Sequence, residues 1–465
     1  MTTTVTTSSS TLSPEQVQSA IRLTYGQMML NAVFGASTGG MFLIGFALSL
    51  GASDMMLGVL SSLPMFCVVF QIGSAYLLER GASYKRVTVV AAFIAPLCWL
   101  FIAAIPFGAA FLSHFQQLIL LVAIVMLVTI VNQFAGNARG SWIGELIPAD
   151  KRSRFFASCA LFAGVVSAFF SIVEGRFLDF IKNNGVYAFA GLFFFGALFG
   201  VISAFLNLPQ PDCPVQRSNA GGFRQAVVAV RHNRPLMRLL GTVMVMSLGT
   251  ICSPFVSAYC LRDVGMSYFG LGCVNSVTTI FMLIFSPFFG RLVGRIGGRP
   301  VLIAGLALFA PLGLVWMFIP PGRADLAYII LPLNNVVSGC ILAGINIAFA
   351  TLLYKMTTAQ GRAVQLAVYT ICATLTAAPM PLIGGWMVTT LRAHGFDVDV
   401  RLTFYLWTLF TALAALMACR ISEPGSISTR VLVFDYIPQW LTSMTGTILS
   451  LPEQLLGALR RDKDE

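Results

Sequence analysis

The sequence has few charged residues. Asp, Glu, Lys and Arg make up only 10% of its 465 residues, whereas soluble globular domains carry about a quarter. The chain is also 57% apolar, with a mean hydropathy of +0.83, which is too apolar for a soluble core covered by a polar surface. These values exclude an ordinary soluble domain and predict a polytopic membrane protein.

Catalytic and metal-binding motifs are also missing. The three histidines lie between apolar runs, and the chain contains no H-E-x-x-H and no phosphate-binding loop. The ten cysteines include no C-x-x-C pair and have no histidine at metal-ligand spacing. We therefore expect no enzyme activity, no metal site and no cofactor.

Long stretches without Asp, Glu, Lys or Arg are present throughout the chain. The longest, 87–138, has room for two membrane spans and is interrupted near Pro106 and His114. Because one span needs about 20 apolar residues, the stretches predict an all-α membrane protein with twelve transmembrane helices. The stretches are 23–53, 55–78, 87–138, 155–173, 183–211, 239–261, 264–290, 300–322, 326–354, 363–391 and 402–419.

Lys and Arg are distributed unevenly among the predicted loops. With the N-terminus inside, six of the 29 lie outside and 23 face the cytoplasm. This bias predicts that both termini are cytoplasmic and that the protein is a multi-pass protein of the cell inner membrane. The net charge of +11 then faces anionic lipid headgroups and does not indicate nucleic acid binding. The six outer cations are Arg176, Lys182, Arg262, Arg323, Arg392 and Arg401.

A glycine-rich and arginine-rich stretch, Gly290–Leu302, separates the eighth and ninth predicted spans. Its glycines are expected to let the backbone reverse in a tight turn, and its arginines, with no acid among them, place that turn in the cytoplasm. The residues concerned are Gly290, Gly294, Gly297 and Gly298, with Arg291, Arg295 and Arg299.

This turn resembles the loop G-x-x-x-D-R-x-G-R-R of the major facilitator superfamily of secondary transporters, although a glycine stands at the acidic position. The resemblance implies two six-helix halves around a central cavity, and a loop motif that stabilises the outward-open state. The matching positions are Gly290, Arg295, Gly297 and Arg299, with Glu79 and Arg80 in a poorer copy about half the chain earlier. The expected parts are an N-terminal segment 1–22, halves 23–210 and 239–420, a linker 211–238 and an interfacial tail 421–465.

Three features predict irregular helices. Pro254 predicts an interrupted seventh span, and Pro379 with Pro381 predicts a break in the eleventh. Gly35 and Gly39 form a G-x-x-x-G pair, which we interpret as a helix-packing motif in the first span.

Amide and hydroxyl side chains recur in the first, fourth, seventh and tenth spans, which line the cavity in the superfamily. Lipid cannot satisfy such groups, so they face either a solute cavity or neighbouring helices. They suit a neutral solute, although an anion has Arg22 or Arg139 at the inner mouth. The predicted solute-binding residues are Gln27, Asn31, Thr38, Gln133, Asn137, Tyr259, Asn334, Asn335 and Asn346.

Carboxylates within apolar spans are scarce. Glu174 follows nineteen residues without charge, and Asp54 begins the second span, where it is also suited to cap the helix. Glu174 has an alternative role in a surface ion pair with Arg176. We expect transport to be either uncoupled or coupled to protons through Glu174, with Asp54 as the second choice.

Together these features predict a monomeric secondary active or facilitative transporter of a small polar solute, working by alternating access, with solute and membrane lipid as its partners. One alternative is an exporter of amphipathic compounds, which the 38 Phe and 19 Met favour and the absence of a Gly-Pro motif in the fifth span disfavours. A second alternative is a transporter-like receptor or assembly partner that moves no solute.

Overall fold

The computed structural model describes residues 14–147, 149–181, 185–212, 231, 233–357, 362–394, 399–423 and 425–426. These residues form helices joined by short turns, with no strand among them. Within them, 12 helical segments are long and apolar enough to cross a bilayer, so the chain is a multi-pass membrane protein. Most of the predicted linker and tail lies outside the described residues.

Six spans precede the predicted linker and six follow it. The first six are built from α1 (Pro14–Thr38) and α2 (Gly40–Ser49); α3 (Asp54–Phe66), η1 (Cys67–Val69) and α4 (Phe70–Glu79); α5 (Tyr84–Ala104) and η2 (Ile105–Ala110); α6 (His114–Leu146); α7 (Ala149–Phe180); and α8 (Val186–Phe205). The second six are α10 (Arg234–Leu248), η4 (Gly249–Cys252), α11 (Ser253–Ala258) and η5 (Tyr259–Val264); α12 (Tyr268–Ile296); α13 (Gly298–Phe309) and η6 (Ala310–Phe318); α14 (Ala324–Met356); α15 (Arg362–Ala377) and α16 (Met380–Ala393); and α17 (Arg401–Ala418).

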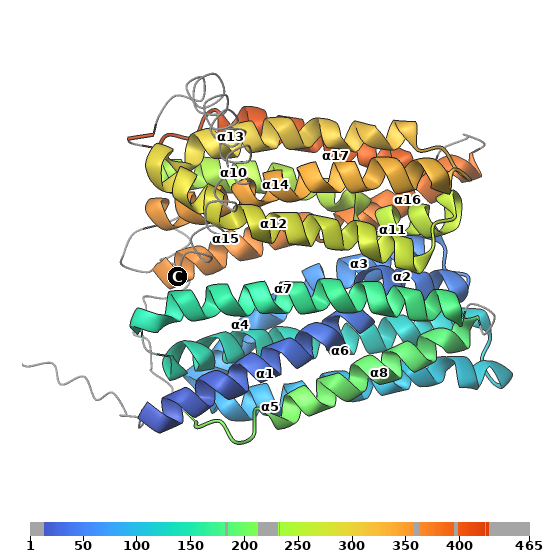
Figure 1. The fold of residues 1–465 in the computed structure, drawn as a ribbon, viewed down its shortest axis with the longest axis horizontal. Coiled ribbons are helices and arrows are strands. Elements are labelled where there is room, and N and C mark those ends of the chain that lie inside the picture. Colours follow the sequence, from blue (N-terminus) through green and yellow to red (C-terminus); the bar gives the residue numbers. More distant parts are fainter. Residues whose placement is uncertain are drawn as a thin grey trace, which may run out of the picture.

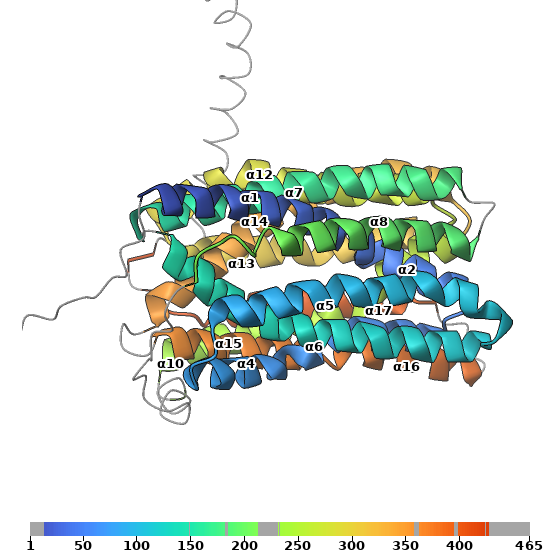
Figure 2. The same ribbon diagram turned by 90° about the horizontal axis from the view of Figure 1, so that it is seen from below.

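Helices α1 to α8 form one bundle and α10 to α17 a second, and the two lie side by side (Figure 1). We call them the N-bundle and the C-bundle. They meet along a seam where α7 packs on α12, α3 on α16 and α2 on α11. Figure 2 shows the N-bundle from its outer side, with α5, α6 and α8 crossing the view. We name the two ends of the molecule after Asp54 and Glu423, which lie at opposite ends of their bundles.

The first span is broken where the sequence suggested packing. Gly39 is extended and Gly40 has φ +53°, a conformation that favours glycine, so α1 ends and α2 begins there. Gly39 therefore lies at a break in the span and outside any regular helix. A Cβ on Gly39 would lie 3.0 Å from the Gly35 carbonyl oxygen, so the backbone at the break leaves little room for a side chain.

The breaks predicted from proline are confirmed. The seventh span passes through the 3₁₀ turn η4 just before Pro254 at the start of α11. In the eleventh span, α15 ends at Ala377 and α16 begins at Met380, with Pro379 between them. Proline has no N–H to continue the helical bonding, so each span divides at these positions.

The predicted glycine turn is shorter than expected. Helix α12 continues to Ile296 and α13 begins at Gly298, so Gly297, with φ +95°, makes the reversal. Gly290 and Gly294 lie inside α12, and their assignment to the turn is wrong. A glycine within a helix costs only about 1 kcal/mol, which the surrounding hydrogen bonds of a long helix offset.

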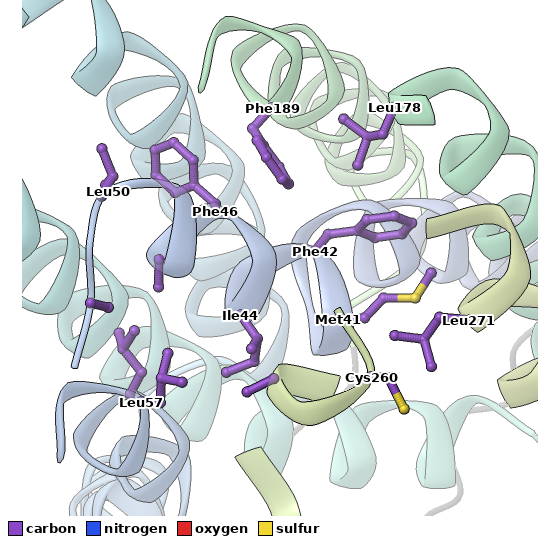
Figure 3. Close-up of a cluster of buried hydrophobic side chains, with 14 of the residues drawn as sticks. Met41, Phe42, Ile44, Phe46, Leu50, Leu57, Leu178, Phe189, Cys260 and Leu271 are labelled. Carbon is purple, nitrogen blue, oxygen red and sulfur yellow. The ribbon is translucent and has the colours of Figure 1, made fainter. Parts of the chain in front are cut away.

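The hydrophobic core differs between the two ends. Near the Asp54 end, one cluster takes residues from both bundles, including Phe42 and Leu57 from the N-bundle and Cys260 and Leu271 from the C-bundle (Figure 3). Toward the Glu423 end, the clusters around Trp142 and around Leu302 each belong to one bundle. The bundles are therefore packed together at the Asp54 end.

Candidate functional site

The C-bundle contains a cavity of about 210 Å³. Asn334 presents a buried Oδ1 with no hydrogen-bond partner among the described residues, and the neighbouring Asn335 donates its amide to the Val274 carbonyl oxygen at 2.8 Å. The cavity thus has one amide oxygen, that of Asn334, which is free to accept a hydrogen bond beside aromatic side chains. Its polar lining is Asn275, Thr278, Asn334, Asn335 and Ser338, and its aromatic lining is Trp316, Phe404 and Trp407.

The N-bundle contains a second cavity, of about 130 Å³, among α1, α5, α6 and α8. Gln27 donates to Ser203 Oγ at 3.1 Å and accepts a hydrogen bond from the Arg139 guanidinium. Thr88 Oγ1 is buried and has no partner within the described structure. The polar lining is Gln27, Asn31, Thr88, Asn132, Arg139, Ser203 and Asn207.

Four of the nine predicted solute-binding residues line these cavities: Gln27 and Asn31 in the N-bundle, Asn334 and Asn335 in the C-bundle. The two predicted hydroxyls lie elsewhere. Thr38 bonds back to the Phe34 carbonyl oxygen, and the fully buried Tyr259 donates to the Ile319 carbonyl oxygen at 2.7 Å.

The remaining predicted amides bond to neighbouring helices. Gln133 accepts from Gln71 and donates to the Pro64 carbonyl oxygen, which ties α6 to the second span. Asn346 donates to Met282 Sδ on α12 at 3.7 Å. The side chain of Asn137 lies outside the described part of the chain.

Asp54 holds the two bundles together. Its side chain is only 5% exposed, and its two oxygens accept from Arg262 Nη1 at 2.8 Å and from Arg392 Nη1 at 2.7 Å. Ser53 caps α3 by accepting from the Met56 amide, so the interpretation of Asp54 as the cap is wrong. Sequence reasoning placed both arginines among the outer cations and gave no signal that they share one carboxylate.

A second carboxylate crosses the seam at the same end. Asp179, in the last turn of α7, accepts from the backbone amides of Tyr268 and Phe269 at 3.0 and 2.8 Å. It therefore caps α12 of the other bundle, where an anion is favoured by the helix dipole. The backbones are also close, since a Cβ on Gly175 would lie 2.6 Å from the Tyr268 carbonyl oxygen.

Glu174 is buried inside the N-bundle and is 3% exposed. Its Oε1 accepts from Ser37 Oγ at 2.5 Å, while its Oε2 is buried with no partner among the described residues. Arg176 instead lies 5.9 Å from the centre of the Phe269 ring, so Glu174 forms no ion pair with it in this structure.

At the opposite end, Glu423 fastens the glycine turn. It accepts from the Arg299 amide at 2.8 Å and from Lys355 Nζ at 2.7 Å, while the Arg299 guanidinium bonds the Cys419 carbonyl oxygen. Burial acts to raise the pKa of Glu423, but the hydrogen bonds from Lys355 and the backbone amides of Arg299 and Gly298 outweigh it and lower the pKa.

The N-bundle has an equivalent arrangement. Ser83, which caps α5, donates to Asp212 Oδ2 at 2.7 Å, and Asp212 follows the last helix of its bundle as Glu423 does. Of the motif residues, Arg80 lies 4.4 Å from the Tyr76 ring centre and Arg295 is exposed. The side chain of Glu79 lies outside the described residues.

Three comparisons place these features among known proteins. Residues 238–431 match the sequence model of the Major Facilitator Superfamily. No curated protein matches the chain. Among solved structures, a mutant of the nucleoside transporter NupG has a TM-score of 0.70 at 12% identity, covering 87% of this chain and all of its own. A bacterial homologue of the human lysosomal transporter Spinster, inward-facing and unoccupied, has a TM-score of 0.63 at 14% identity, with 90% of this chain and all of that one covered. The xylose transporter XylE from E. coli has a TM-score of 0.62 at 15% identity, with coverages of 89% and 100%.

These likenesses extend over both bundles, while the sequence match lies in the C-bundle and includes the turn at Gly297. With twelve candidate spans in two bundles and a cavity in each, the chain has the fold of these solved transporters, and its C-bundle matches the Major Facilitator Superfamily model.

Proposed function

We propose that the protein is a secondary transporter that moves a small polar solute across the inner membrane by alternating access between its two bundles. The observation that carries the proposal is the asymmetry of the seam. A shared hydrophobic cluster, the Asp54 ion pairs and the Asp179 cap join the bundles at one end, while the core toward the other end is divided between them. Rocking about such a seam would open the cavities to one side at a time.

The positive-inside bias assigns the sides. It puts the Glu423 end and both termini in the cytoplasm, so the Asp54 end is the closed outer end and the structure corresponds to an inward-facing state. Cys419 is exposed at the Glu423 end and provides a test. An impermeant thiol reagent should label it in inverted vesicles, and labelling from outside intact cells would contradict the orientation.

The cavity linings support a solute that hydrogen-bonds and also presents an apolar face. Asn334 and Ser338 offer donors and acceptors, while Trp316 and Trp407 offer flat apolar surfaces in the same cavity. Each chain contains both bundles, so a monomer suffices for transport.

Glu174 is the group that we propose for proton coupling. Its carboxyl group is buried among apolar helices, has one uncommitted oxygen and lies on α7, which forms part of the seam. Gain or loss of a proton at Oε2 would change the charge of Glu174 beside the seam, where the two bundles are proposed to move against each other. Asp54 instead has both oxygens engaged by arginines, which suits a gate.

Uptake into proteoliposomes tests the transport proposal. Purified protein should give saturable flux of at least one solute from a panel of sugars, amino acids, nucleosides and organic acids. Asp54→Asn should change that flux, because it weakens the closed outer end. Binding of a panel solute without any flux would instead favour a receptor role, and flux confined to amphipathic compounds added to the panel would favour the exporter.

A further inference from the structure

The N-bundle cavity contains an arginine that has no acid beside it within the part of the chain that the structure describes. Arg139 lies on α6, and its guanidinium donates to Gln27 Oε1 on α1. It takes part in none of the ion pairs found among the described residues. A cation inside a helix bundle is costly unless an anion compensates it.

Among the described residues, no acid lines the cavity, and Glu15, the one acid of α1, lies twelve residues before Gln27. Helices α5 and α8, which form two walls of the cavity, contain no Asp or Glu. On α6 the nearest acid is the exposed Glu145, six residues further on, and that spacing separates the two side chains by about 120° around the helix. The positive charge of Arg139 therefore remains available to a bound group.

The same cavity also contains neutral hydrogen-bond donors that could bind an anion together with Arg139. Thr88 is 2% exposed and lines the cavity with a buried hydroxyl oxygen that has no partner among the described residues. The amides of Asn31, Asn132 and Asn207 line it as well. A carboxylate has two oxygens that accept several hydrogen bonds, and a guanidinium fork matches its geometry.

We infer that this cavity binds the carboxylate of a small monoanionic solute, with Arg139 as counter-ion. The inference rests on the proposed transport function and names its substrate class. A monoanion fits because Arg139 is the single cation that the described residues place in the lining, whose other walls include Phe34, Pro96 and alanines. A phosphate or dicarboxylate dianion would leave one charge uncompensated beside apolar walls.

Matched ligands test the assignment on purified full-length protein. Lactate and benzoate carry the carboxylate, while lactamide and benzamide have the same shape without charge. The carboxylates should raise the Tm of wild type, with a smaller rise in Arg139→Lys and none in Arg139→Gln. The expected loss of affinity in Arg139→Gln is roughly tenfold or more. Arg86→Gln, which removes an exposed arginine of α5, should behave as wild type.

Chemical protection gives a second readout. Phenylglyoxal should modify Arg139, and lactate or benzoate, but not their amides, should slow that modification as mapped by mass spectrometry. Equal effects from the amides, a Tm rise retained in Arg139→Gln, stabilisation by inorganic phosphate alone, or no effect of either carboxylate in both assays would each overturn the inference.

Flux separates this inference from the proposed function. If carboxylates bind at Arg139 but no solute of the panel is transported, the transport proposal fails while the site stands. If a neutral solute is transported equally by wild type and Arg139→Gln, and carboxylates have no effect on binding or flux, the site fails while transport stands.

Discussion

Asp54 and Arg392 are separated by 338 positions in the sequence, and their side chains meet at 2.7 Å across the seam between the bundles. Arg262 reaches the second oxygen of the same carboxylate from the end of the seventh span. One buried acid therefore links three spans, one from the N-bundle and two from the C-bundle. Any motion that separates the bundles at this end must break both ion pairs.

Asp54→Asn tests the role of this carboxylate as a gate. The variant keeps the side-chain size but removes the charge, which should shift the equilibrium toward opening of the Asp54 end by about 1–3 kcal/mol. The fully buried Cys260 near this end, kept as the sole cysteine, should then react faster with an impermeant maleimide added outside. Asp325→Asn, which breaks an exposed pair with Arg323, is the matched control and should leave the rate unchanged. Equal rates in all three proteins would remove Asp54 from the gate.

Gly385→Ala tests the close approach of α16 to α3. A Cβ at this position would lie 2.5 Å from the Asp54 carbonyl oxygen, and backbone cannot move aside as a flexible side chain can. We expect the closed seam to lose about 1–3 kcal/mol and the Tm to fall. At Gly290 an added Cβ meets nothing within 4 Å, so Gly290→Ala should keep or raise the Tm. A fall of the same size in both variants would mean that close packing at the seam is not the cause.

Asn334→Leu tests the C-bundle cavity. The substitution removes the uncommitted amide and should lower kcat/KM for transport by roughly fivefold to tenfold, since one hydrogen bond to a solute contributes about 1 kcal/mol. Asn346→Leu removes an amide that bonds Met282 Sδ outside the cavity lining and should have less effect. Both variants should retain normal expression and monodispersity. The reverse order of effects would place the solute elsewhere.

Glu174→Gln tests the coupling proposal. The amide preserves the contact with Ser37 but cannot exchange a proton, so uptake driven by an imposed pH gradient should be lost while exchange of solute at equal pH persists. Measuring both modes in the same proteoliposomes separates coupling from folding. Concentrative uptake that survives in Glu174→Gln and in Asp54→Asn would show that protons couple at another residue, or not at all.

Glu423→Gln tests the fastening of the turn at Gly297. Because the folded-state pKa of Glu423 is lowered, its stabilising contribution is fully present above the unfolded value of about 4.3 and is lost as the pH falls through the lower folded value. The variant should lose about 1–2 kcal/mol at pH 7, and the difference in Tm from wild type should shrink below about pH 4. A difference in Tm that is independent of pH would contradict the ionic origin of this contribution.

The sequence by itself determined the class of this protein and much of its local structure. Charge-free stretches of bilayer length predict twelve spans, because in a membrane the backbone must bond within each segment. The breaks at Pro254 and Pro379 follow from the missing proline N–H, and the turn at Gly297 from a positive φ that glycine tolerates. These features depend on a few neighbouring residues, so they can be predicted from the sequence.

Only the tertiary structure decided how the polar side chains are used. Asn334 and Asn346 read alike in the sequence, yet one faces a cavity and the other bonds a methionine sulfur on α12. Asp54, Arg262 and Arg392 looked like independent groups at helix ends until packing brought them together. A residue's partners across a seam depend on how whole helices rotate and pack, and a single sequence gives no distance between positions hundreds of residues apart.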